Sequence, residues 1–167
     1  MLTTLGDAGI LFHNYAIVGS QISGMVTRAT STPNYNSRYD PNRKCFLLSL
    51  CGINNFFAGQ SAASAYAEYA AYCTTQKNLG FKMIAFTLSS VDPSLVTDPD
   101  APAAYSALIR ANYATFADAL VDLDLDSSVG GLTNYSNPTY FIDGVHMTTA
   151  GWAKIASLAI TAVTSLL

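Results

Sequence analysis

An aspartate and a histidine lie three residues apart near the end of the chain, in the stretch Tyr140-Phe-Ile-Asp143-Gly-Val-His146. A carboxylate and an imidazole on one tight loop can hydrogen-bond, so the aspartate can fix the tautomer of the histidine and stabilise the imidazolium that forms when the ring takes a proton. The pair would then supply the base and the orienting acid of a hydrolytic triad. The alternative is an Asx-type turn before a helix, with His146 an ordinary residue of the first helical turn.

Length and composition limit the classes of function that this pair can serve. The 167 residues are expected to form one domain, spanning 1–167, that is large enough to bury most of its apolar surface. Charged residues make up 11% of the chain, against about 25% in an average protein, and the net charge is −3. Because binding to nucleic acid needs a basic surface, we expect no nucleic-acid partner and a small molecule as substrate.

The sequence shows no signal that would place the protein at a membrane. Its apolar runs are interrupted well short of the length that spans a bilayer, and its first residues lack the basic region and apolar core of a signal peptide. We therefore expect no membrane partner. The localisation stays unknown, and the richness in serine, threonine and asparagine is compatible with an exported ancestor.

No residue pattern predicts a metal or another cofactor. Three cysteines without metal-ligand spacing are expected to be small buried hydrophobes, namely Cys45, Cys51 and Cys73. Aspartates at positions 122, 124 and 126 alternate with leucines in a way that suggests a calcium loop, but the glycine and final glutamate of an EF-hand are missing. A strand end with polar residues on one side is the preferred interpretation.

Apolar runs that suit buried strands alternate with segments of helical period, which predicts an α/β fold with a mainly parallel sheet. The expected strands are residues 12–18, 45–50, 82–88 and 119–123, and the expected helices are 61–79, 102–118 and 148–167. Gly80 should close the first of these helices and Pro102 should open the second. Arg110 would then lie on the solvent or capping face of its helix.

Ligands of open parallel sheets collect at the carboxyl ends of the strands, and three loops are expected there. They are residues 18–21, 51–55 and 143–146. Gly19 in Asn14-Tyr-Ala-Ile-Val-Gly, the stretch Gly52-Ile-Asn-Asn, and Asp143-Gly-Val-His followed by Thr-x-x-Gly-Trp resemble the second, third and fifth sequence blocks of the SGNH (GDSL-type) hydrolases.

This resemblance covers the chain in order and implies a flavodoxin-like three-layer α/β/α sandwich. It implies that the N–H of Gly19 and the side-chain amide of Asn54 form an oxyanion hole, and that Asp143 and His146 act on the nucleophile. In one respect the third block departs from the family pattern of Gly-x-Asn-Asp, because its last position is Asn55. The donor amide of Asn54 is kept.

The first block of the family, a strand that ends in Gly-Asp-Ser with the nucleophile, has no counterpart in the sequence. Gly6-Asp7-Ala8 imitates it, but only ten residues separate Ala8 from Gly19. A parallel crossover needs about a dozen residues or more, so no helix fits between the two. We expect the first strand and its nucleophile loop to be missing.

Two routes to hydrolysis then stay open. His146 could activate a water directly as general base, or it could activate a recruited hydroxyl, for which Ser20 is best placed because it follows the oxyanion glycine. The alternative role for Ser20 is to cap the following helix. Cys51 lies beside the oxyanion loop, but no neighbour in sequence would lower the pKa of its thiol.

The sequence therefore predicts an esterase that acts on short acyl or aryl esters without a cofactor or metal. A catalytically inactive module that binds an ester or an acetylated carbohydrate is the alternative. Because the family's first strand lies inside the sheet, its loss would leave edges unpaired, and we expect a homo-oligomer.

Overall fold

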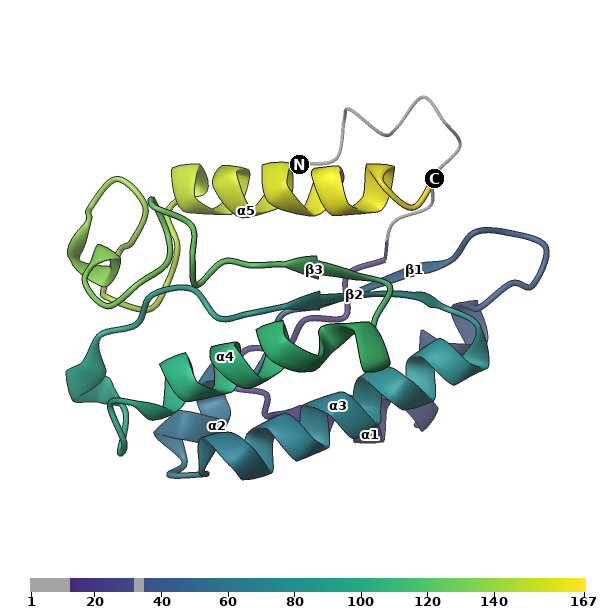
Figure 1. The fold of residues 1–167 in the computed structure, drawn as a ribbon, viewed down its shortest axis with the longest axis horizontal. Coiled ribbons are helices and arrows are strands. Elements are labelled where there is room, and N and C mark those ends of the chain that lie inside the picture. Colours follow the sequence, from purple (N-terminus) through teal and green to yellow (C-terminus); the bar gives the residue numbers. More distant parts are fainter. Residues whose placement is uncertain (1–12, 32–34) are drawn as a thin grey trace.

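The computed structural model describes residues 13–31 and 35–167, and these form a parallel sheet with helices on both faces. The strands lie in the order β1-β2-β3. In Figure 1, α5 covers one face of the sheet, and α1 to α4 lie on the other. The elements are β1 (Phe46–Ser49), β2 (Lys82–Phe86), β3 (Ala119–Val121), α1 (Ile22–Thr30), α2 (Ile53–Phe57), α3 (Ala62–Leu79), α4 (Ala101–Asn112) and α5 (Thr149–Thr164). The predicted three-layer α/β/α architecture is confirmed.

The central strand β2 is buried on both faces, and its side chains enter two separate cores. Met83 and Ala85 pack among the helices α1, α3 and α4, whereas Ile84 and Phe86 pack against α5. This explains why the strand is a continuous apolar run instead of an alternating one. The largest fully buried side chains of the first core are aromatic, namely Tyr69, Tyr105, Phe56 and Phe116, and their rings meet at tilted and edge-on angles.

The helix α3 begins and ends at the residues that the sequence predicts. The Oγ of Ser61 accepts a hydrogen bond from the N–H of Ser64 and thus caps the first turn. Gly80 ends the helix at φ 116°, a backbone conformation that residues with a side chain rarely adopt. The predicted strands at 45–50 and 82–88 and the final helix are confirmed as β1, β2 and α5, each a few residues shorter than expected.

The strand predicted at residues 12–18 is wrong for the part that the structure describes. Residues 13–17 have no regular structure and join no strand of the sheet, and a turn follows in which the N–H of Ser20 donates to the carbonyl of Ile17. Ile17 and Val18 are 55% and 96% exposed. An apolar run becomes a strand only where a neighbour pairs with it, and no described strand lies beside this one. Phe12 and the Gly6-Asp7-Ala8 segment lie outside the described residues.

Two further differences concern helices. The helix predicted at 102–118 ends at Asn112, because Asp118 is bound to the start of β2: its N–H donates to the carbonyl of Met83, and its carboxylate accepts the N–H of Met83. The helix α1 and the short helix α2, which begins shortly after β1, were not predicted. Within the described residues no helix is long and apolar enough to cross a membrane.

The conformation of Gly80 gives a test of this packing. A Cβ at Gly80 would collide with the hydroxyl end of Tyr39, whose ring packs on Phe81. Gly131 is the matched control, since its φ is also positive (73°) but a Cβ there would meet nothing within 4 Å. We expect Gly131→Ala to lower the free energy of unfolding by about 1 kcal/mol and Gly80→Ala to lower it by more. Urea denaturation measures both free energies of unfolding. An equal decrease in the two variants would contradict a collision between the new Cβ and Tyr39.

Candidate active site

The loop that carries His146 is closed by its own backbone and anchored to the helix that follows. The N–H of Ile142 donates to the carbonyl of His146, 2.8 Å away, and Gly144 allows the tight turn with φ 81°. Thr148 then caps α5, since its Oγ1 accepts the N–H of Gly151 and donates to the carbonyl of Thr139. His146 therefore lies before the helix and is not a residue of its first turn.

Asp143 and His146 are hydrogen-bonded to each other. Asp143 Oδ1 accepts the backbone N–H groups of Val145 and His146 at 3.2 and 2.9 Å, and its Oδ2 lies 2.8 Å from Nδ1 of the imidazole. The Asx-type turn and the carboxylate–imidazole pair of the two interpretations thus exist together. Because an ionised carboxylate only accepts hydrogen bonds, this contact selects the tautomer of the neutral ring that carries its proton on Nδ1 and leaves the lone pair of Nε2 for a substrate or a nucleophile.

The Asp143 carboxylate is held in its charged form by this loop. The backbone N–H of His146, then the His146 ring and the N–H of Val145 lower the pKa of Asp143 to about 2. The carboxylate is therefore ionised over the whole range in which a histidine can act as a base. Both side chains are open to solvent, with His146 70% exposed.

A cavity of about 190 Å³ lies beside His146, at the carboxyl end of the sheet. It opens between the loops that follow β1 and β2 and the start of α5. Its lining is largely apolar and consists of Leu50, Cys51, Ile53, Leu88, Ser89, Ser90, Val91, Val145, His146, Met147, Trp152 and Ile155. The arrangement is that of a small binding pocket with a few polar groups on its wall.

The other predicted site residues form a second group. The Nδ2 of Asn54 donates to the carbonyl of Ser20 at 3.0 Å, so the 18–21 loop meets the 51–55 segment, of which residues 53–55 belong to α2 and not to a loop. Gly19 is exposed with φ 73°. None of these three residues is among those that line the cavity, although Ile53, the neighbour of Asn54, is. The structure joins Asp143 to His146 and Asn54 to Ser20, and their predicted roles stay predictions.

The hydroxyl of Ser20 is engaged within its own loop. Its Oγ accepts a hydrogen bond from Nη2 of Arg28 at 2.8 Å and donates to the carbonyl of Gln21 at 3.1 Å. The first helix begins after Gln21 without a side-chain cap, so the predicted alternative of Ser20 as a helix cap is wrong. Burial raises the pKa of the Cys51 thiol to about 12, which makes a thiolate nucleophile unfavourable there.

The acidic run at 122–126 is neutralised by basic side chains. Arg110 binds Asp122 through Nε (2.5 Å) and Nη2 (2.9 Å), and its Nη2 also lies 2.6 Å from Asp124. Lys154 pairs with Asp126 at 3.0 Å. Among the described residues no group of three or more acidic, histidine or cysteine side chains could hold a metal ion.

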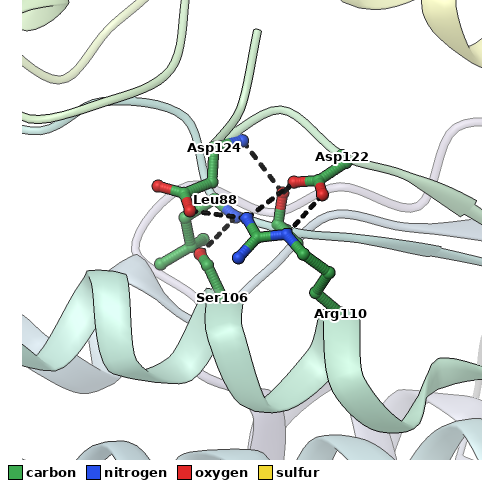
Figure 2. A network of polar contacts seen from close by, with 6 residues as sticks. Leu88, Ser106, Arg110, Asp122 and Asp124 are labelled. Carbon is green, nitrogen blue, oxygen red and sulfur yellow. Dashed lines mark hydrogen bonds and ion pairs between the residues drawn. The ribbon is translucent and has the colours of Figure 1, made fainter.

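Arg110 is a structural residue of the sheet edge instead of a solvent-facing one. Figure 2 shows it reaching from α4 to the ends of β2 and β3, where the hydroxyl of Thr87 donates to Asp122 and accepts the N–H of Asp124. Burial alone would raise the pKa of Asp122, but the hydrogen bonds from Arg110 and Thr87 lower it. The network fixes the loop that leaves β2.

Sequence reasoning missed Ser89 and Ser90, which line the cavity directly after β2. Their position at the carboxyl end of a predicted strand was the signal that could have found them.

Solved structures share this fold over nearly the whole chain. An acetyl xylan esterase, AlAXEase, superposes with a TM-score of 0.74 at 18% identity over 96% of this chain and 86% of its own. A GDSL-like lipase from Bacteroides thetaiotaomicron gives 0.71 at 19% identity, covering 98% and 79%. The SGNH-hydrolase family esterase AlinE4 gives 0.59 at 16% identity, covering 99% and 82%. These likenesses confirm the predicted fold; no family model and no curated protein matches the sequence.

The depressed pKa of Asp143 gives a prediction with a definite sign. A carboxyl whose folded pKa lies below its unfolded value stabilises the fold above the unfolded pKa and loses that effect as the pH falls toward about 2. The side-chain carbon shift of Asp143, followed by NMR on acidification, should have its midpoint near pH 2. His146→Ala keeps the backbone N–H, the largest cause, so the midpoint should stay clearly below 3.8. A midpoint of 3.8 in His146→Ala would show that the imidazole ring, and not the backbone N–H groups, keeps the pKa of Asp143 low.

Proposed function

We propose that this chain, which has the fold of the SGNH hydrolases, hydrolyses esters with His146 as general base and with the carboxylate of Asp143 orienting the imidazole ring. The observation that carries the proposal is the 2.8 Å contact between Asp143 Oδ2 and His146 Nδ1, which leaves Nε2 free beside a cavity. In this state the imidazole can take a proton from a nucleophile and give it to the leaving alcohol.

The size of the cavity supports an ester with a small acyl group as the substrate. Its volume of about 190 Å³ lies below the ~300 Å³ at which pockets for drug-sized ligands begin. Its wall of leucine, isoleucine, valine and methionine side chains suits a short hydrocarbon or aryl group. The names of the similar structures, an acetyl xylan esterase, a lipase and an esterase, support ester hydrolysis as the reaction class.

The oxyanion donors are proposed to be the amide of Asn54 and the N–H of Gly19. Asn54 follows Ile53, which lines the cavity, and its Nδ2 is held in place by the carbonyl of Ser20. In the reaction the oxyanion would replace this carbonyl as acceptor. A donor of this kind is worth about 10² to 10³ in rate. The nucleophile is either a water or a serine hydroxyl that His146 deprotonates.

A binding module is the second candidate, because His146 is 70% exposed and no serine hydroxyl of the described residues hydrogen-bonds to it. Such a module would keep the cavity and bind an ester without cleaving it.

Hydrolysis of p-nitrophenyl acetate separates the two. We expect turnover by the wild type and a loss of about 10² to 10⁴ in His146→Ala, the usual effect of removing a general base. His13→Ala is the matched control, since His13 is the other histidine of the chain and lies in an exposed segment beside Tyr15. Unchanged activity in His146→Ala would contradict the enzymatic proposal, and binding without turnover would favour the module.

The association expected from the sequence is likewise a proposal. Among the described strands β1 pairs only with β2, and Leu48 of β1 is 40% exposed although it belongs to an apolar strand. A second copy could cover this strand. Light scattering after gel filtration should give a dimer or larger species, and a monomer at all concentrations would contradict the proposal.

A further inference from the structure

Ser89 lies in the loop that leaves β2, and three residues near it in this loop, Leu88, Ser90 and Asp92, donate backbone hydrogen bonds. The N–H of Leu88 donates to Ser106 Oγ at 3.1 Å, as Figure 2 shows, and the N–H of Ser90 donates to the carbonyl of Val129 at 2.7 Å. The N–H of Asp92 donates to the carbonyl of Gly144 at 2.9 Å. The last contact joins the loop of Ser89 to the loop of His146.

The hydroxyl of Ser89 is free, in contrast to the other hydroxyls near the cavity. Within the described part of the chain Ser89 Oγ has no hydrogen-bond partner, and the residue is half-buried. Ser90 Oγ accepts the N–H of Tyr135 at 3.0 Å, and this residue is only 5% exposed. Ser20 is occupied by Arg28 and Gln21 and does not line the cavity. Among the described residues that line the cavity with His146, Ser89 is thus the one whose hydroxyl has no hydrogen-bond partner.

We propose that Ser89 is the nucleophile that His146 activates. This inference rests on the proposed ester hydrolysis and assigns the group that the sequence left open between a water and Ser20. Ser89 follows a different strand from the one that carries the nucleophile in the family that the chain resembles. The site would therefore keep the family's base and use a hydroxyl from the neighbouring strand end.

The reaction balances with these two groups and water. His146 Nε2 takes the proton of Ser89 Oγ as the Oγ–carbon bond to the acyl group forms, and the imidazolium then protonates the leaving alcohol as the ester carbon–oxygen bond breaks. A water next loses a proton to Nε2 and attacks the acyl carbon. The carbon–Oγ bond breaks, and Oγ takes the proton back. Asp143 holds the ring and stays ionised throughout.

Non-additive kinetics test the assignment. A nucleophile and its base act as a unit, so removal of both costs no more than removal of either. We expect Ser89→Ala, His146→Ala and the double variant to share one residual rate with p-nitrophenyl acetate, whereas Ser157→Ala, at an exposed serine of α5 that does not line the cavity, keeps the wild-type rate. Thermal unfolding of each variant checks that the fold is kept.

Labelling of the wild-type chain with a fluorophosphonate, followed by peptide mass spectrometry, identifies the nucleophile without any substitution. An adduct on Ser89 that needs His146 supports the inference. An adduct on Ser20 or Ser90, or hydrolysis that depends on His146 but gives no adduct, would overturn it and leave the proposed ester hydrolysis intact. A hydrolysis rate that His146→Ala leaves unchanged, or a wild type that does not hydrolyse the ester, would instead contradict the proposed function and this inference with it.

Discussion

The carboxylate of Asp143 is the group on which the candidate site depends, because it stabilises the loop and orients the base at once. Its Oδ1 accepts two backbone N–H groups of the turn, and its Oδ2 binds the imidazole. A side chain that bound only the backbone of the turn would leave the imidazole ring of His146 free to rotate. One that bound only the ring would leave the N–H groups of Val145 and His146 without this acceptor. Since His146 is exposed to solvent, no packing would replace this contact.

The carboxyl edge of the sheet brings this loop to its cavity. Residues after β1 and after β2 form two walls, and the start of α5 forms the third. Arg110 binds the residues that follow β3 and, through Thr87, those that follow β2. This network fixes the start of the β2 loop, and the hydrogen bond between Asp92 and Gly144 joins the loop to the one that carries His146. Such support is what a site built on loops needs to keep its geometry.

The sequence predicted those features that depend on local signals. Ser61 and Gly80 bound α3, the apolar run of β2 is buried on both faces, and Asp143 meets His146, because all three follow from spacing or capping chemistry. It failed where a partner distant in sequence decides the outcome. Residues 13–17 are apolar but have no described strand to pair with, and helical period could not reveal that Arg110 binds the residues after β3. The direction of a loop side chain such as that of Ser89 is not encoded in any pattern.

The most direct test of the account is the rate of p-nitrophenyl acetate hydrolysis by Asp143→Asn. The amide still offers an oxygen to the backbone N–H groups of the turn, but its NH₂ faces Nδ1 of His146 and would move the ring proton to Nε2. If Asp143 fixes the tautomer of a working base, the rate falls by about 10² to 10⁴ while the variant stays folded. A rate equal to that of the wild type would contradict the claim that this pair performs the chemistry.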